Sequence, residues 1–325
     1  PSAFENRDRD DMFSFGLMPS ILARYAKGHD PFDPRISPLH ANDVSVLPPT
    51  IFQVGEREML RDHSVQMAEK MRAAGVEVNM MPEFAEEAAQ VNEAFFHFMN
   101  TGKPLVTLKC AVTLDGKIAA PVDNTGWITS ERARAHVQTL RHASDVMLTG
   151  SGTVLADDPL LTDRSGLPRS RKLLRVVLDS TLRLPLGSKL VESVDDDLLV
   201  ATTSAGSPER RAALEAKCVE VRVFDGPRGR VDIRDVVAEL GRRRYLSVMI
   251  EAGSMVNWAA LDAGVVDKVF LYYAPKILGG LQSLPLAGGA GRQRRTDALV
   301  LERTRLSDLL RYVREAHLAE ETAPM

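Results

Sequence analysis

From Lys103 to about residue 315, short apolar strand patterns alternate with amphipathic helix patterns. The strand patterns are PLVTLKCAVT, DVMLTGSGTV (which enters a Gly-rich turn), LRVVLDS, DLLVATT, CVEVRVF, YLSVMIEAG and DKVFLYYAPKIL. The helix patterns between them are SERARAHVQTLRHA, IRDVVAELGRR and MVNWAALDAG. Strands that alternate with helices predict an α/β fold, in which helices cover the faces of one central sheet.

The first 82 residues have a different pattern. An irregular loop is predicted for DPFDPRISPLH, followed by a strand in PPTIFQVGE, a helix that ends at Gly75 and a second strand in VEVNMM. A single βαβ unit of this kind cannot cover both faces of a sheet. A further helix, EEAAQVNEAFFHFMNTG, leads into the α/β region. We therefore predict a partial N-terminal βαβ segment over residues 1–82 and an α/β domain over residues 83–325.

The composition excludes several classes of protein. The chain is 44% apolar and 26% charged, as in soluble globular proteins, and its formal charge of −3 gives no basic surface for nucleic acid or an anionic membrane. No apolar run is long enough to span a bilayer. The two cysteines, Cys110 and Cys218, lie far apart and fit neither a metal site nor a disulfide framework. We therefore expect no metal and a reducing, cytoplasmic setting.

Three charged residues stand in or just after the first strand pattern of the domain, in KCAVTLDGKIAA. Asp115 and Gly116 predict the turn that ends this strand, and Lys117 is expected to be solvated beside it. Lys109 has no such explanation, because it falls within the apolar run. It is therefore a candidate for reaching a ligand above a central strand.

Two glycine-containing loops follow predicted strands. TGSGTVLADDP contains Gly150 and Gly152, and IEAGSMVNWAALDAG contains Gly253 followed by Ser254 as a candidate helix N-cap. Backbone N–H groups at such positions bind phosphate groups well. Neither loop has the spacing G-x-G-x-x-G, so a Rossmann fingerprint is absent. Each loop taken alone also suits an ordinary turn.

Six motifs occur in order along residues 83 to 315: TLKCAVTLDGKIA, WITSERAR, LRHASDVMLTGSGTVLADDPLLTDR, LRVVLDSTLRLP, IEAGSMV and APKILGG. In these motifs the chain resembles the reductase domain of bifunctional riboflavin biosynthesis deaminase–reductases. The resemblance implies a dihydrofolate-reductase-like sheet with flanking helices and a homodimer, for which the long last strand is a candidate contact. It also implies NADPH-dependent reduction of 5-amino-6-(5-phosphoribosylamino)uracil to the ribitylamino product, or a related reduction.

The resemblance also assigns roles to individual residues. It implies catalytic roles for Lys109, Asp157 and Glu251, for which a structural ion pair among them is the less favoured alternative. It also implies sugar-phosphate contacts for Arg141, Leu161, Arg164 and Glu251. Cofactor contacts are implied for Ala111, Trp127, Gly150, Gly152, Thr153, Asp157, Gly253 and Ser254. The chain departs from the family at Ala252, where a Gly-Gly pair normally follows the glutamate. That departure bears on how tightly the cofactor binds.

Two alternatives concern the rest of the chain. Around PPTIFQVGEREMLRDHSVQMAEKMRAAGVEV it resembles the C-terminal part of α/β-hydrolases of the hormone-sensitive-lipase family, with Glu58 at the position of the triad acid. No nucleophile elbow G-x-S-x-G occurs in the sequence. The alternative hypotheses are a carboxylesterase-derived protein and a catalytically impaired chimera of two genes.

The deaminase motifs H-x-E and P-C-x-x-C are also absent, so deamination is not expected.

Overall fold

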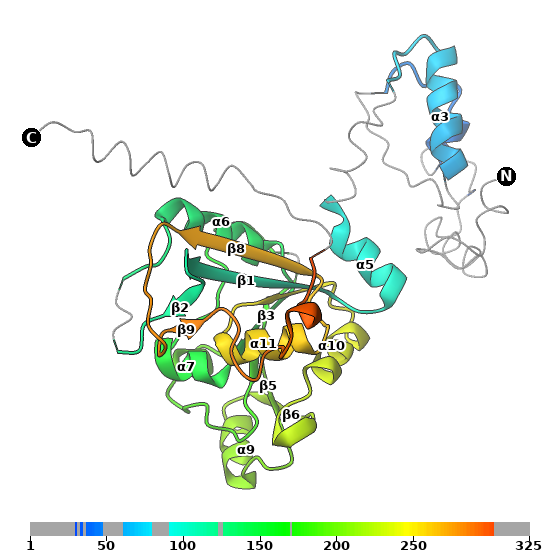
Figure 1. The fold of residues 1–325 in the computed structure, drawn as a ribbon. Helices are drawn as coiled ribbons and strands as arrows, with labels where there is room; N and C mark the ends of the chain where they lie inside the picture. The colour runs from blue at the N-terminus through cyan, green and yellow to red at the C-terminus, as the bar shows by residue number, and fades with distance from the viewer. Residues whose placement is uncertain are drawn as a thin grey trace, which may run out of the picture. The chain divides into compact units, whose positions relative to one another are not determined.

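The computed structural model describes residues 30, 33–34, 37–47, 61–79, 91–122, 126–169 and 171–301. By internal packing the chain divides into two compact units, residues 1–101 and 102–325, each considered by itself below (Figure 1). The boundary predicted at residues 82 and 83 lies outside the described residues and stays a prediction.

The first unit contains a short helical segment η2 (Pro38–His40) and helices α3 (Arg61–Ala73) and α5 (Glu93–Thr101). A small apolar core joins Val44 to two methionines of α3, and the Lys70 ammonium donates to the carbonyl of Leu39 at 2.8 Å. The helix predicted to end at Gly75 is confirmed, and Gly75 adopts a positive φ of 80°.

The two strands predicted in this unit have different outcomes. The strand predicted from residue 76 is wrong over residues 76–79, which pair with no other described segment and form no ladder. The strand predicted in PPTIFQVGE lies outside the described residues.

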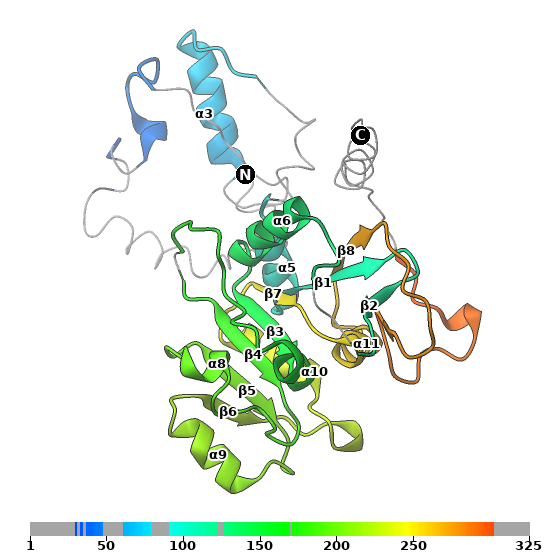
Figure 2. The same cartoon turned by 90° about the vertical axis from the view of Figure 1, so that its left-hand side faces the viewer.

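The second unit is built on a seven-stranded sheet in the order β6-β5-β4-β3-β7-β1-β8 (Figure 2). Every neighbouring pair is parallel. The strands are β1 (Leu105–Thr113), β3 (Val146–Gly150), β4 (Leu174–Leu178), β5 (Leu198–Thr202), β6 (Glu220–Val223), β7 (Ser247–Ile250) and β8 (Lys268–Ala274). The predicted α/β sheet with flanking helices is confirmed, and parallel strands account for the nearly continuous apolar runs.

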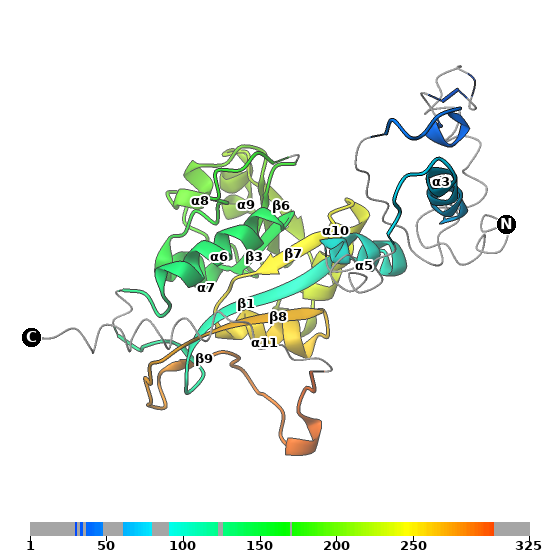
Figure 3. The same cartoon turned by 90° about the horizontal axis from the view of Figure 1, so that it is seen from above.

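Helices cover both faces of this sheet (Figure 3). On one face the core includes residues of α6 (Glu131–His142), α7 (Ser151–Asp157), α8 (Lys189–Glu192) and α9 (Pro208–Glu215). On the other face it includes residues of α10 (Ile233–Arg242) and α11 (Ser254–Asp262). Ser130 caps α6 by accepting from the amide of Ala133, and Asp232 caps α10 by accepting from that of Arg234. Such caps each stabilise a helix by about 1 kcal/mol.

Three local predictions are corrected. The predicted Gly-rich turn after β3 is the helix α7, with Gly150 as its N-cap. Gly253, and not Ser254, is the N-cap of α11, so Ser254 is the first helical residue. The last strand ends at Ala274, earlier than predicted, because Pro275 follows and has no N–H to donate.

Beyond the main sheet, β2 (Lys117–Ala119) pairs antiparallel with β9 (Leu284–Pro285), and the one-turn helices η4 (Pro227–Gly229) and η5 (Arg295–Asp297) occupy loops. The turn predicted at Asp115 and Gly116 is confirmed by the φ of 73° at Gly116. The Asp115 carboxylate also accepts from the amide of Gly279 at 2.7 Å. Its pKa falls to about 2, mainly because the Thr113 hydroxyl donates to it.

None of the described helices is long and apolar enough to cross a membrane.

Gly150 has a packing role at the end of β3. A Cβ atom there would lie 2.7 Å from the Cγ2 atom of Val256 in α11, whereas one at Gly152 would meet no atom within 4 Å. A valine in a helix has little χ1 freedom with which to move away. The first glycine therefore allows α11 to approach the sheet closely.

We expect Gly150→Ala to destabilise the protein by about 1–3 kcal/mol through this overlap. The matched change Gly152→Ala should be neutral or stabilising by up to about 1 kcal/mol, because alanine favours a helix and has room there. Urea unfolding of both variants measures the difference. Equal effects of the two substitutions would contradict the packing role.

Candidate active site

The candidate site lies where β7 ends and β1 continues. Strand β7 pairs with β1 only from Leu105 to Leu108, whereas β8 pairs with β1 as far as Thr113. Lys109 lies in the middle of β1 and is thus the first residue of that strand beyond the end of β7. Ligands of parallel sheets bind beyond the carboxyl ends of the strands. The short β7 leaves such a position beside the middle of β1.

The alternation of β1 decides which way Lys109 points. Leu108 and Val106 belong to the core beneath α10 and α11, whereas Ala111 packs with the core on the opposite face. Because side chains alternate along a strand, Lys109 shares the face of Ala111. It is therefore directed to the side of the sheet that α6 covers.

Three charged side chains meet at this place. The Lys109 ammonium lies 3.4 Å from Oε2 of Glu251, the residue after β7. The Arg141 guanidinium, from the last turn of α6, binds the same carboxylate through Nε to Oε1 at 2.7 Å and through Nη2 to Oε2 at 3.0 Å. The three side chains are only 12–15% exposed. The structure therefore brings together three residues for which the sequence predicted catalytic or substrate contacts.

The electrostatics of the site keep Glu251 ionised. Burial alone would raise the pKa of Glu251, but the hydrogen bond from Arg141 and the charge of Lys109 outweigh it and hold the pKa below its ordinary value. Two cations and one carboxylate leave an excess positive charge at the site. An anionic or hydroxyl-bearing ligand suits such a place.

Sequence reasoning missed a second pair of side chains beside this group. Tyr272, in β8, lies under the Lys109 ammonium, which is 5.9 Å from the ring centroid, and its hydroxyl is 2.7 Å from Nδ1 of His136 in α6. Burial, and next the negative charge of Glu251, raise the pKa of Tyr272. Its hydroxyl therefore stays protonated. A tyrosine within a buried strand signals that its hydroxyl needs a partner, although it does not identify the partner.

The start of α11 has features that fit a phosphate-bearing cofactor. The Gly253 amide donates to Oγ1 of Thr153 at 3.1 Å, which joins α11 to α7. The hydroxyl of Ser254 is buried without a hydrogen-bond partner among the described residues. The first amides of a helix also have no partner within it. Ala252 has no positive φ, so its side chain causes no backbone strain where the related family has glycine.

Several predicted residues lie apart from the charged group. Asp157 ends α7 and forms no hydrogen bond or ion pair with Lys109 or Glu251 in the described part of the chain, and desolvation raises its pKa. Trp127 is 67% exposed, and the guanidinium of Arg134 lies over its ring at 4.8 Å. The roles predicted for Asp157 and Trp127 stay predictions.

The predicted sugar-phosphate residues Leu161 and Arg164 lie on the segment that follows α7. Leu161 has a left-handed φ of 51° and a buried side chain, whereas Arg164 is exposed. This segment contacts α6, because Nη1 of Arg141 donates to the carbonyl of Thr162 at 2.9 Å. Arg141 is thus the link between the segment and Glu251.

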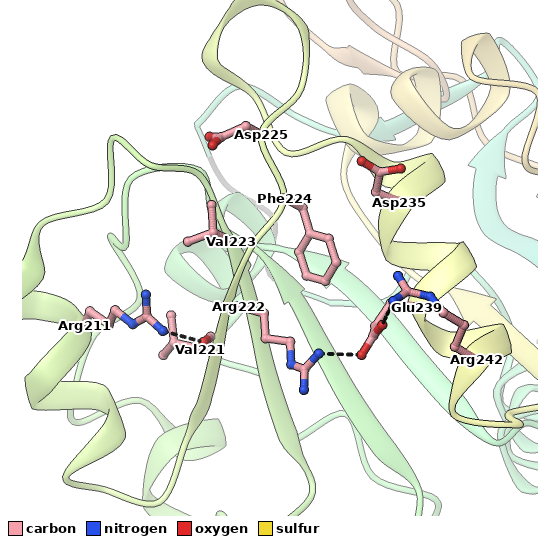
Figure 4. Close-up of a pocket in the computed structure, with 9 residues that line it drawn as sticks. All are labelled: Arg211, Val221, Arg222, Val223, Phe224, Asp225, Asp235, Glu239 and Arg242. Atoms are coloured by element: carbon pink, nitrogen blue, oxygen red, sulfur yellow. Dashed lines mark hydrogen bonds and ion pairs between the residues drawn. The ribbon is translucent and has the colours of Figure 1, made fainter.

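A hollow of about 650 Å³ lies between β6 and α10 (Figure 4). Strand β6 is at the opposite edge of the sheet from β1 and β8 (Figure 2). No residue predicted for the site lines this hollow. Its charged groups largely neutralise one another, as Arg222 and Arg242 bind the Glu239 carboxylate at 2.6 and 2.9 Å. We assign these ion pairs a structural role.

Comparison with known families identifies the family of the chain. The RibD C-terminal domain model matches residues 104–311. The chain belongs to the RibD C-terminal domain family. A second model, of the alpha/beta hydrolase fold, matches residues 2–86. Glu58, the candidate triad acid of a hydrolase, lies outside the described residues.

Curated relatives of this RibD-family chain include two bacterial proteins. The riboflavin biosynthesis protein RibD of Actinobacillus pleuropneumoniae is 38% identical over 235 residues, which cover 72% of this chain and 62% of the relative. That of Escherichia coli strain K12 is 35% identical over 234 residues, covering 66% and 61%. The chain therefore spans about three fifths of the length of these relatives.

Solved structures give the same family. RibD of Acinetobacter baumannii superposes with a TM-score of 0.58 at 30% identity, covering 71% of this chain and 62% of that one. A diaminohydroxyphosphoribosylaminopyrimidine deaminase/5-amino-6-(5-phosphoribosylamino)uracil reductase of Thermotoga maritima superposes at 0.51 with 32% identity, covering 67% and 57%. These likenesses confirm the fold and the family predicted from the sequence motifs.

We expect Glu251→Gln to lower the free energy of unfolding by about 2 kcal/mol at neutral pH, because two buried cations lose their carboxylate. The lowered pKa of Glu251 means that its charge stabilises the fold above about pH 4.3, the ordinary value of a glutamate. That stabilisation is lost as the pH falls through the folded pKa. Denaturant titrations from pH 7 to 3 should therefore show the gap between the two proteins closing at acid pH. A gap independent of pH would argue against an ionised Glu251.

Proposed function

We propose that the chain reduces 5-amino-6-(5-phosphoribosylamino)uracil, or a closely related ribosylamino compound, to its ribitylamino form. The observation that carries this proposal is the convergence of Lys109, Glu251 and Arg141 beyond the end of β7. Membership in the RibD C-terminal domain family supports the substrate, as does the reductase activity for which the similar Thermotoga maritima protein is named.

The reaction adds a hydride to C1′ of the sugar and a proton to the ring oxygen that leaves C1′ when the ring opens. The Lys109 ammonium is suited to donate that proton, and solvent restores it because the side chain retains some exposure. Glu251, held ionised, accepts hydrogen bonds from sugar hydroxyls and keeps Lys109 in place. Arg141 uses three of its five N–H donors on Glu251 and Thr162, and the remaining two are suited to the substrate phosphate.

We further propose NADPH as the cofactor, since it supplies a hydride to an electrophilic carbon when bound. Gly253, Ser254 and Thr153 are the residues suited to hold its phosphate groups, with the buried Ser254 hydroxyl as a donor that has no partner among the described residues. Ala111 shares the sheet face of Lys109 and is suited to contact the nicotinamide. Gly150, Gly152, Asp157, Trp127, Leu161 and Arg164 complete the proposed contacts to cofactor and substrate.

Two finer proposals concern the setting. We propose a homodimer, in which β8 at the end of the sheet order is the contact strand. We also propose a cytoplasmic location, consistent with two cysteines that form no disulfide. The impaired-chimera alternative predicts NADPH binding without turnover. An assay of NADPH oxidation with the ribosylamino-pyrimidine phosphate therefore separates it from the proposed reductase.

We expect the wild-type chain to oxidise NADPH only when the ribosylamino-pyrimidine phosphate is present. Lys109→Ala should reduce the rate by about 100-fold or more, since it removes the proton donor and a charge at the reacting centre. Fluorescence titration should show that this variant still binds NADPH. Absorbance at the NADPH band measures turnover, and an undiminished rate in Lys109→Ala would contradict the role of the lysine.

A further inference from the structure

Three consecutive residues of the segment that follows α7 form hydrogen bonds or ion pairs with side chains of α6. The Arg164 amide donates to Oε1 of Gln138 at 2.9 Å, and the Thr162 carbonyl accepts from Arg141 at 2.9 Å. Between them, the Asp163 carboxylate lies 2.8 Å from Nδ1 of His142. Three consecutive residues of the segment are therefore bound by side chains from the C-terminal part of α6.

Arg169 closes this set of contacts from the far end of the segment. Its Nη1 donates to the carbonyls of Arg141 and His142 at 3.2 and 2.9 Å and to Oδ2 of Asp163 at 3.1 Å. Its Nη2 donates to the carbonyl of Ser144. One guanidinium thus satisfies carbonyls at the C-terminal end of α6 and neutralises the aspartate that joins the segment to the helix.

The ion pair between Asp163 and Arg169 is well shielded, with side chains 6% and 18% exposed. Burial alone would raise the pKa of Asp163, but hydrogen bonds from Ser165, His142 and Arg169 outweigh it and hold the pKa well below its ordinary value. Asp163 therefore stays ionised at neutral pH.

The same segment contains a strained residue. Leu161 holds a left-handed φ of 51° with its side chain in the core, a backbone conformation that costs about 1–3 kcal/mol and persists only where the surroundings enforce it. On the C-terminal side of Leu161, the contacts of Asp163 and Arg169 hold the backbone in this conformation.

We infer that Arg169, acting through Asp163, is a positioning residue that sets the sugar-phosphate contacts of this enzyme. The inference rests on the proposed function. Arg169 holds the backbone from which the exposed Arg164 side chain projects, and its bond to the Arg141 carbonyl fixes the helix end that presents the Arg141 guanidinium to Glu251. The proposed cofactor contacts at Gly253 and Thr153 lie on other elements, so loss of Arg169 weakens substrate binding and leaves cofactor binding unchanged.

The chain offers a matched control two residues away. Arg171 also binds carbonyls just beyond a helix, donating to Arg244 at 2.9 Å and to Arg243 at 3.2 Å past the end of α10, and its guanidinium stacks 3.5 Å over Tyr245. Arg171→Ala therefore removes an arginine of similar structural role without touching Asp163 or α6. A general loss of stability should appear in both variants. Weaker binding of the sugar phosphate, caused by misplaced contacts, should appear only in Arg169→Ala.

The test compares wild type, Arg169→Ala, Asp163→Asn and Arg171→Ala by steady-state kinetics with NADPH and the ribosylamino-pyrimidine phosphate. We expect the KM for the sugar phosphate to rise about tenfold or more in Arg169→Ala and by a smaller factor in Asp163→Asn. The KM for NADPH should stay within about twofold of wild type in every variant, and Arg171→Ala should leave both constants unchanged. If Arg169→Ala does not fold, Asp163→Asn carries the same comparison.

Calorimetric titration with ribose 5-phosphate, as a probe of the phosphate contacts alone, separates this inference from the proposed reaction. Binding of the probe by wild type without turnover would reject the reaction, and weaker binding by Arg169→Ala than by Arg171→Ala would still support positioning. Equal effects of the two arginine substitutions on sugar-phosphate KM and probe binding would overturn the inference. Absence of both turnover and probe binding in wild type would overturn the inference and the proposed function together.

Discussion

The Glu251 carboxylate is held between Arg141 and Lys109, three side chains that come from different parts of the chain and meet at one point of the sheet. A carboxylate this shielded is costly to bury unless opposite charges and hydrogen bonds compensate for the lost water. Arg141 supplies two parallel hydrogen bonds and Lys109 a second charge. This ion group requires α6 to lie against the sheet at the end of β7 and β1 to extend past it. The same requirement creates a shielded charged site beside the middle of β1.

Helix α6 joins this ion group to the segment that follows α7. Its last turn carries Arg141 toward Glu251, while its backbone carbonyls there accept from Arg169. The helix thus connects the ion group to the segment around Leu161 and Asp163, whose backbone is strained and needs support. On the far face of the sheet, Gly150 lets α11 approach β3 closely, which places Gly253 beside Thr153. The proposed substrate and cofactor contacts therefore depend on different helices.

Much of this arrangement could be predicted from the sequence, for reasons that are visible in particular segments. The buried strands β3 and β5 are continuous apolar runs, and α6 begins at a serine cap, so local patterns sufficed. Lys109 stood out because a charge inside such a run has few structural explanations. Its grouping with Glu251 came from the family resemblance, which also placed Asp157 in that group and gave Arg141 a separate contact to the sugar phosphate. No local pattern states which residues of distant segments meet. The loop predicted at Gly150 and Gly152 is a helix because packing against the sheet outweighs the low helix propensity of glycine.

Other features depend on register and tertiary contact, which a single sequence does not encode locally. Tyr272 faces His136 because β8 pairs with β1 in one register, opposite Ala111. Arg169 is close to Asp163 in the chain, but its role appears only once the segment between them folds back onto the end of α6. The strand predicted at residues 76–79 was wrong, because its local pattern suits a strand but no described segment pairs with it.

The central claim is that the ion group beyond the end of β7 is where the substrate reacts. A crystal structure of the chain with NADP⁺ and the ribitylamino product phosphate tests it most directly. We predict the sugar in contact with Lys109 and Glu251, its phosphate against Arg141 or Arg164, and the cofactor phosphates at the start of α11. Product bound in the hollow between β6 and α10, or elsewhere without contact to Lys109, Arg141 or Glu251, would contradict the account.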